Sequence, residues 1–279
     1  MKNKILLFNR KDLPIVNSTG EEWTYTLSNN YAHIKKYKGS ETEVTIPDYI
    51  DGYETRYTST SRGIFSSSDK VVYANIGHNL KNSMTTMVDL FLLSKGLVSV
   101  DKHIVGRNVT NMYGAFAGCY NLVNSPIIPN SVEFMISTFE LCTNLVDSPI
   151  IPNSVVNMAY TFAGCANLTN IPESLPNSVV DMRYTYIDCT NITKAPTIPD
   201  SVVEASYTFS GCTKLTGDIY IYSNEIANAT RCFHGTSLPK TVHIYEYYEN
   251  GEHTKTYNSF NTAGYLGGIN GVTVEFMNE

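Results

Sequence analysis

Six cysteines and six histidines are the residues of this 279-residue chain that most readily suggest a reactive or metal-binding site. Five of the cysteines recur at intervals of 23, 23, 24 and 23 residues: Cys119, Cys142, Cys165, Cys189 and Cys212. Zinc sites typically use cysteine pairs about two to four residues apart, and no such pair occurs here. Cysteines one turn apart in a coil would lie about 4.8 Å from each other, within disulfide reach. Serine replaces cysteine in two weaker copies, Ser68 and Ser94, so we favour a column of buried free thiols over disulfides.

The histidines and carboxylates show no arrangement that is typical of catalysis. His243 and His253 could face each other across a terminal hairpin, but we interpret them as unliganded, and no Gly-x-Ser-x-Gly or P-loop motif occurs. Asp181, Asp188 and Glu204 recur with the repeat, as expected of a solvated face. We therefore predict a protein that is not an enzyme and has no catalytic residue, metal or cofactor.

The cysteine spacing belongs to a longer repeated unit in which an aromatic residue, a cysteine, an asparagine and a leucine keep fixed positions. A period in the low twenties is typical of a solenoid, whose turns bury their apolar sides against their neighbours. We predict a mainly β repeat solenoid, a leucine-rich-repeat-like right-handed coil of about 23-residue turns with short strands and helical turns, capped by β-hairpins. The predicted core ladder consists of Phe116, Cys119, Leu122, Phe139, Cys142, Leu145, Phe162, Cys165, Leu168, Cys189, Phe209 and Cys212.

Each predicted turn contains two strand-like segments and one helical turn. One segment runs from the Leu122 position towards a proline pair, the second surrounds the Val132 position, and the helical turn contains the aromatic residue and the cysteine. A further column is formed by Asn121, Asn144, Asn167 and Asn191. An amide there can bond the backbone and the next turn, and a polar binding ladder is the alternative.

The order of patterns along the chain predicts four parts. Residues 1–20 are expected to form an N-terminal arm, residues 21–39 a hairpin cap, residues 40–238 the solenoid and residues 239–279 a C-terminal β cap. The caps are needed because the first and last turns would otherwise expose apolar ends and unpaired strand edges.

Composition limits the classes of partner. Apolar residues make up 42% of the chain and charged residues 16%, a balance typical of folded proteins. The formal net charge of −6 argues against nucleic acid. We also find neither an apolar run of about 20 residues for a membrane helix nor a recognisable secretory signal, and we expect no membrane insertion.

Two stretches resemble a known family. Residues 40–53 are similar to the opening of BspA-like leucine-rich repeats, and the Met-x-x-x-Phe-x-x-Cys-x-Asn-Leu units resemble their later turns. Departures are Phe65 and Phe91, which lack the cysteine, and Tyr186, which replaces phenylalanine. The resemblance covers about residues 22–240 and implies adhesion at bacterial surfaces; similar units occur in phage structural proteins, which residues 239–265 resemble more loosely.

The variable positions of the repeat predict a contact surface. Tyrosines recur two residues before the aromatic core position, and the candidate ligand-contact strip consists of Tyr160, Tyr184, Tyr207, Arg231, Asn157 and Asp181. The alternative is that these tyrosines only cover the coil. We expect a non-enzymatic adhesion module on a phage virion that recognises a host glycan or protein. It would contact other virion proteins through residues 1–20, and homo-oligomers are allowed. The alternatives are a purely structural virion component and a bacterial cell-surface adhesin.

Overall fold

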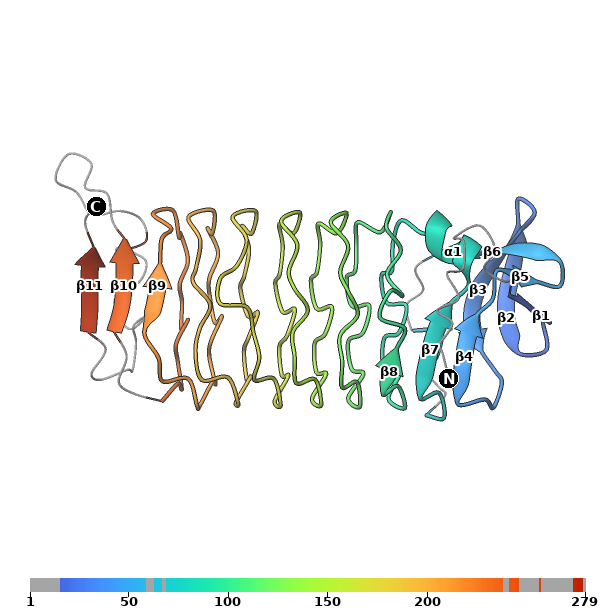
Figure 1. Ribbon diagram of the computed structural model, residues 1–279, viewed down its shortest axis with the longest axis horizontal. Helices are drawn as coiled ribbons and strands as arrows, with labels where there is room; N and C mark the ends of the chain where they lie inside the picture. The colour runs from blue at the N-terminus through green and yellow to red at the C-terminus, as the bar shows by residue number, and fades with distance from the viewer. Residues whose placement is uncertain are drawn as a thin grey trace, which may run out of the picture.

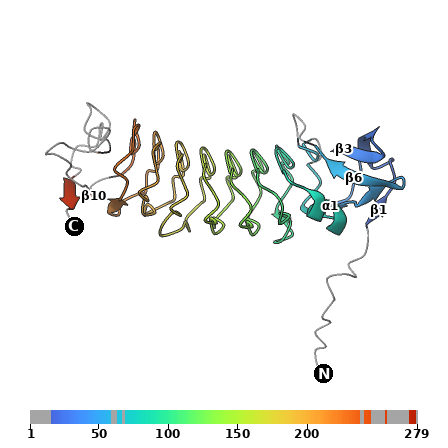
Figure 2. The same cartoon turned by 90° about the horizontal axis from the view of Figure 1, so that it is seen from above.

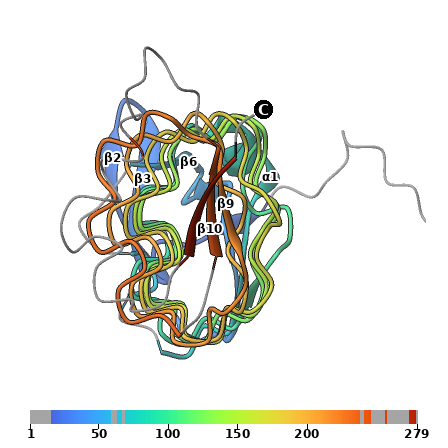
Figure 3. The same cartoon turned by 90° about the vertical axis from the view of Figure 1, so that its left-hand side faces the viewer.

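The protein is an elongated stack of about 8 turns with little helix (Figure 1). The computed structural model describes residues 16–58, 63–66, 69–237, 241–245, 256 and 273–277, the last range by its backbone alone. Viewed from above, the turns follow one another along a single axis (Figure 2), and viewed from one end they superimpose (Figure 3). The predicted solenoid is thereby confirmed.

The N-terminal end of the rod is a five-stranded sheet with the order β1-β5-β6-β3-β2. Its strands are β1 (Asn17–Ser18), β2 (Trp23–Ser28), β3 (Tyr31–Tyr37), β5 (Tyr49–Ile50) and β6 (Tyr53–Tyr57). Strands β2 and β3 form the predicted antiparallel hairpin, whose turn residues Asn29 and Asn30 have φ of 49° and 63°. Strand β6 pairs in parallel with β3, so the cap is larger than a single hairpin.

Part of the expected arm, residues 1–20, lies within the N-terminal sheet. Residues 17–18 form β1, which pairs with Tyr49 and Ile50 of β5, and residues 1–15 lie outside the described residues. The buried Asp48 carboxylate fixes this segment because its Oδ2 accepts a hydrogen bond from Val16 N at 3.1 Å. The sequence gives no periodic signal here because β1 has only 2 residues.

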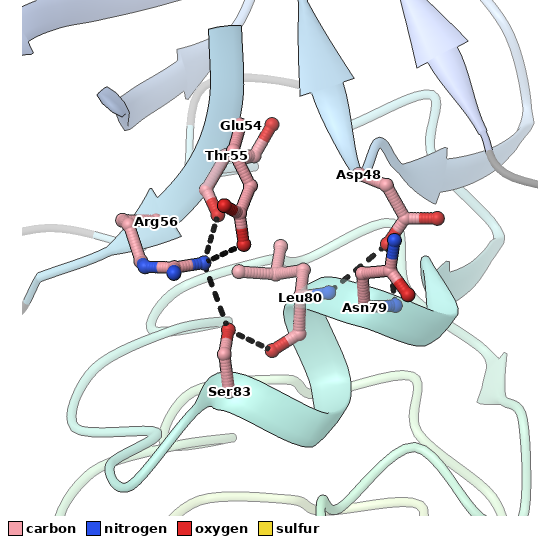
Figure 4. Close-up of polar contacts among 7 residues, drawn as sticks. All are labelled: Asp48, Glu54, Thr55, Arg56, Asn79, Leu80 and Ser83. Atoms are coloured by element: carbon pink, nitrogen blue, oxygen red, sulfur yellow. Dashed lines mark hydrogen bonds and ion pairs between the residues drawn. The ribbon is translucent and has the colours of Figure 1, made fainter. Parts of the chain in front are cut away.

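Helix α1 (His78–Ser83) joins the N-terminal sheet to the first turns (Figure 4). Asp48 Oδ1 accepts hydrogen bonds from the backbone nitrogens of Asn79 and Leu80 at 2.8 and 3.0 Å, so a distant carboxylate satisfies the first N–H groups of the helix. At the other end of α1, Ser83 Oγ accepts a hydrogen bond from Arg56 at 3.2 Å. Helix α1 is therefore held from both ends by the cap.

The first turns contain a second sheet, with the order β4-β7-β8 and parallel pairing throughout. Its strands are β4 (Glu43–Ile46), β7 (Tyr73–Ile76) and β8 (Ser99–Val100). Strand β4 ends directly before Pro47, which has no backbone N–H to donate to a ladder. In the regular turns that follow, the two predicted strand segments shrink to single bridges, such as Asn111 with Phe134 and Asn124 with Asp147. The backbone between these bridges is turn, because each coil bends too often for a longer strand.

An unbroken aromatic column fills the centre of the coil. Neighbouring rings stack with centroids 5.1–5.7 Å apart in the series Phe65, Phe91, Phe116, Phe139, Phe162, Tyr186, Phe209 and Phe233. Trp23 and Tyr37 of the N-terminal hairpin pack edge-on against Phe65, so the predicted lid closes the first turn. Every member of the predicted core ladder has a relative exposure of 0%.

All six cysteines are free and buried. Each thiol of the main column donates to the carbonyl oxygen of the aromatic residue one turn earlier, at 3.0–3.2 Å: Cys119 to Phe91, Cys142 to Phe116, Cys165 to Phe139, Cys189 to Phe162 and Cys212 to Tyr186. Ser94 occupies the same column and is 1% exposed, while Ser68 lies outside the described residues. The thiols therefore connect successive turns by hydrogen bonds.

The C-terminal end differs from the expected hairpin cap. Strand β10 (Thr241–Tyr245) pairs in parallel with β9 (Ile219–Ile221) on one side and with β11 (Thr273–Met277) on the other. A parallel pair needs a crossover connection, so the final strand extends the coil's own sheet instead of folding back on β10. Apart from residue 256, the chain between β10 and β11 lies outside the described residues.

Candidate functional site

Three tyrosines of the predicted strip form a stacked column on the outside of the coil. The rings of Tyr160 and Tyr184 have centroids 4.4 Å apart, and those of Tyr184 and Tyr207 are 4.7 Å apart, with interplanar angles of 6° and 7°. All three side chains are half-buried. The exposed Arg231 extends the column, with its guanidinium carbon 5.9 Å from the centre of the Tyr207 ring.

The backbone at these positions has an uncommon conformation. Tyr160, Tyr184, Tyr207 and Arg231 have φ between 50° and 58°, in the left-handed region. Gly114 occupies the same position in an earlier turn, with φ of 59°. For a residue with a Cβ atom this conformation costs about 1–2 kcal/mol, which glycine avoids. The coil therefore tolerates bulky residues at a position where glycine is intrinsically favoured.

The backbone at these positions is hydrogen-bonded to the next turn. The backbone nitrogen of each of these tyrosines donates to a carbonyl of the next turn: Tyr160 to Arg183 at 3.0 Å, Tyr184 to Ser206 at 2.9 Å and Tyr207 to Thr230 at 2.8 Å. Met158 and Phe162 donate to the next turn in the same way without a positive φ, so left-handed and ordinary residues alternate along this side of the coil. Stacking between neighbouring rings, worth about 0.5–1.5 kcal/mol per pair, offsets part of the strain.

Two polar side chains of the predicted strip accept hydrogen bonds from backbone N–H groups. Asn157 Oδ1 accepts a hydrogen bond from Ala159 N at 2.9 Å, and Asp181 Oδ1 accepts one from Arg183 N at 3.1 Å. The two side chains also meet, since Asn157 Nδ2 donates to Asp181 Oδ2 at 3.1 Å. The structure thus places Asn157 and Asp181 in turn-forming roles beside the tyrosine column.

The environment of the column raises the pKa of the Tyr160 phenol. Desolvation is the largest cause, and the neighbouring Tyr184 adds to it, whereas Arg183 acts in the opposite direction. The phenol is therefore neutral at physiological pH and able both to donate and to accept hydrogen bonds. A partner would meet the ring edges and hydroxyl groups, because both faces of Tyr184 are covered by neighbouring rings.

Two columns of hydroxyl groups were not predicted from the sequence. The buried Thr138, Thr161, Thr185 and Thr208 donate to methionine carbonyls one turn earlier, at 2.8–2.9 Å. A serine column donates to valine carbonyls at 2.6–2.7 Å and contains Ser131, Ser154, Ser178, Ser201 and Ser223. The available signal was their recurrence, with each threonine directly before the aromatic core residue and four of the five serines directly before a valine. Both columns stabilise the fold, because their hydroxyl groups donate hydrogen bonds to backbone carbonyls.

The asparagine column is exposed for most of its length. Asn144 Nδ2 lies 3.4 Å from Asn121 Oδ1, and Asn167 Nδ2 lies 3.3 Å from Asn144 Oδ1, so the predicted bonds between turns are present but long. Asn121 Nδ2 also donates to the backbone oxygen of Lys95 at 2.9 Å. In the last of these turns Lys214 Nζ donates to Asn191 Oδ1 at 2.6 Å.

The histidines do not form a metal site within the described part of the chain, where no group of three or more His, Cys, Asp or Glu residues could hold an ion. The His243 ring stacks on Tyr220 with centroids 4.6 Å apart, and its Nε2 is 3.9 Å from Asp218 Oδ2. His253 lies outside the described residues. None of the helices described is long and apolar enough to cross a membrane.

The repeat defines the class of protein. A family model for the BspA type leucine rich repeat region matches in 6 copies, at residues 91–192 and 137–254, which together span more than half of the chain. The chain belongs to the BspA-type leucine-rich repeat family. A comparison with curated protein sequences finds no match.

Solved structures with leucine-rich repeats are distantly similar. A leucine rich repeat protein of T. pallidum is 19% identical, with a TM-score of 0.45 and coverage of 82% of this chain and 85% of that one. A leucine rich cell surface protein of Faecalibacterium prausnitzii is 20% identical, with a TM-score of 0.46 and coverage of 78% of this chain and 56% of that one. A Bacteroides ovatus leucine-rich repeat protein is 18% identical, with a TM-score of 0.46 and coverage of 92% and 77%.

Proposed function

We propose that the chain is a non-enzymatic binding and adhesion module whose tyrosine column contacts a protein or glycan on a host surface. The observation that carries this proposal is the presence of large aromatic residues at a left-handed position, where Gly114 shows that the fold needs no side chain. Strained residues that the fold does not require are often found at functional sites. Tyrosine and arginine are also the residue types enriched at interface hot spots.

The column favours a protein partner over a stacked sugar. Sugar rings usually bind to an open aromatic face, but the rings of Tyr160, Tyr184 and Tyr207 lie face to face at 4.4–4.7 Å. A partner therefore contacts a row of ring edges and phenol groups. Such a row offers apolar area together with hydrogen bonds at low cost in side-chain entropy.

The test is a triple variant with Tyr160→Asn, Tyr184→Asn and Tyr207→Asn. Asparagine adopts the left-handed conformation more readily than most residues, so the backbone is kept while the rings are removed. We expect binding to host cells to fall at least about tenfold, with a small change in melting temperature, because relieved strain offsets part of the lost packing. Cell binding is measured by flow cytometry with the labelled protein.

A control variant carries Tyr53→Asn and Tyr120→Asn, which remove two tyrosines outside the column. It should bind as the wild type does. Equal binding by the wild type, the triple variant and the control would contradict the proposal. Such a result would favour the second candidate, a purely structural component of a particle.

The proposal also covers the particle or surface that carries this module, which we call its carrier. We propose a phage virion first, on the resemblance of residues 239–265, and a bacterial cell surface as the alternative. Residues 1–20 would attach the module to other proteins of the carrier, and a homo-oligomer is compatible with this arrangement. Mass spectrometry of purified particles and of cell envelopes from the producing culture distinguishes the two carriers.

A further inference from the structure

We propose that a groove between α1 and residues 101–107 binds the acidic group of a sugar. The groove has a volume of about 520 Å³ and is lined by His78, Lys81, Asn82, His103 and Arg107. A second hollow of about 340 Å³ shares His78, Lys81 and His103 with it. The site is distinct from the tyrosine column, which lies in later turns.

The groove arises where the repeat is broken. In the regular turns the corresponding bend contains two prolines, such as Pro126 and Pro129, whereas His103 and Gly106 hold these positions here. One turn earlier, helix α1 replaces the bend altogether. Departures from a repeat that leave the core ladder intact are candidates for function, because packing does not require them.

The two walls of the groove are held at a fixed separation. A Cβ atom on Gly106 would lie 2.2 Å from the backbone oxygen of Lys81, so only glycine permits this close approach. Asn108 Nδ2 donates to the backbone oxygen of Asn82 at 2.8 Å, which ties the loop to the helix. The loop is also fixed internally, since His103 N donates to Asp101 Oδ1 at 2.9 Å. The groove is therefore formed before any ligand arrives.

The charges favour an anion. Lys81 is half-buried and Arg107 is exposed, and neither forms a salt bridge with any described residue. No carboxylate lines the larger hollow, although the chain has a formal net charge of −6, and Asp101 borders only the smaller one. A guanidinium and an ammonium that line one hollow suit a carboxylate or a sulfate.

The remaining donors favour an acidic sugar over a bare ion. Asn82 Nδ2 lies 2.9 Å from His78 Nε2, which leaves the Nδ1 atom of that ring as its donor. A volume of about 520 Å³ falls in the range of small-molecule sites and far exceeds one anion. The polar groups around the charged pair can then bond the hydroxyl groups of the sugar that carries the anion.

Calorimetric titration of the full chain tests this proposal with 3′-sialyllactose, lactose 3′-sulfate, lactose and inorganic phosphate as probes. The first two probes distinguish a carboxylate from a sulfate on a common scaffold. We expect at least one of them to bind and lactose not to bind. The double variant Lys81→Gln, Arg107→Gln should weaken that binding at least about tenfold, because charge-assisted hydrogen bonds are lost.

The matched control is Lys95→Gln, Lys194→Gln, which removes the same charge from exposed positions outside the groove. It should bind as the wild type does, and melting temperatures should show that both double variants fold. The proposal is overturned if neither acidic sugar binds, if lactose binds equally well, or if the control weakens binding as much as the groove variant. Phosphate that binds as tightly as the acidic sugars overturns it too, since the groove would then hold an adventitious ion only.

Discussion

At the level of single residues, the aromatic column contains one exception to its apolar character. Tyr186 takes a position that phenylalanine holds in the neighbouring turns, and its ring stacks on Phe162 and Phe209 at 5.6 Å like the other members. Its hydroxyl group is fully buried and has no hydrogen-bond partner in the described structure. A buried hydroxyl without a partner costs about 1–3 kcal/mol, so this residue weakens the coil it fills.

The variant Tyr186→Phe should therefore be more stable than the wild type by about 1–2 kcal/mol, because it removes the buried hydroxyl and keeps the ring. Urea denaturation followed by circular dichroism measures the change. The reverse substitution in the adjacent turn, Phe162→Tyr, serves as the control and should destabilise by a similar amount. A loss of stability in Tyr186→Phe would show that the hydroxyl group has a partner.

The buried thiols make the stability of the coil sensitive to alkaline pH. Burial raises the pKa of the Cys119 thiol from its ordinary 9.0 to about 12, although a hydrogen bond partly opposes the shift. Its contribution to stability is complete below pH 9 and is lost as the pH rises towards 12. Within this window each such thiol lowers the free energy of unfolding by about 1.4 kcal/mol per pH unit.

Replacement of one thiol tests this relation. Between pH 9 and about 10.5 the free energy of unfolding should fall less steeply in Cys119→Ser than in the wild type. The difference in slope should be about 1.4 kcal/mol per pH unit, the value for one ionisable group. The serine is expected to be accepted because Ser94 occupies the same column. Parallel slopes for the two proteins would show that Cys119 is accessible to hydroxide or is not buried.

At the level of elements, the junction between cap and coil depends on one carboxylate. Asp48 is fully buried and accepts hydrogen bonds from Val16, Asn79 and Leu80, so it connects β1, the start of α1 and the strand pair β5–β6. Gly77 is required beside it, since a Cβ atom there would lie 2.4 Å from Asp48 Oδ1.

Asp48→Ala should therefore unfold the cap before the coil, with a loss of about 2 kcal/mol or more, because three N–H groups lose their acceptor. Hydrogen exchange at Asn79 and Leu80 should become fast, while amides near Phe139 stay protected. The exposed Asp200→Ala is the control and should leave both regions unchanged. Unaltered protection at the helix would show that water replaces the carboxylate.

The elements also show how far the sequence predicts this structure. The ladder of Phe, Cys and Leu was predicted because stacking turns must bury identical positions, and a hairpin at residues 21–39 was expected because the first turn needs a cap. The left-handed conformation of the tyrosines was not predictable, since residues with a Cβ atom rarely adopt a positive φ and no sequence pattern marks these positions. The groove at α1 was not predicted either. It lies where the repeat is interrupted, and no sequence motif marks such an interruption as a binding site.

At the level of the whole molecule, each turn contacts mainly its two neighbours, so stability is approximately a sum over turns and their interfaces. Deleting residues 134–156 removes one complete 23-residue turn and places Phe162 where Phe139 had been. We expect this variant to fold and to melt cooperatively at a slightly lower temperature. Deletion of only residues 134–145, which breaks the register, should abolish folding. If the two deletions melt alike by circular dichroism, the turns are not equivalent units.

The forward hydrogen bonds beside the aromatic column have an electrostatic consequence for the rod. In one turn the backbone nitrogens of Met112, Gly114, Phe116 and Gly118 all donate to the following turn, and later turns repeat this orientation. Peptide dipoles of about 3.5 D each therefore add along this side of the coil. Elsewhere in the same turns the backbone nitrogens donate to the preceding turn, as Val123 does to Val98 and Glu133 to Thr110, so their dipoles point the opposite way. The rod therefore carries two opposed rows of peptide dipoles: the row beside the aromatic column has its positive end towards the C-terminal end, and the backward-donating row has its positive end towards the N-terminal cap.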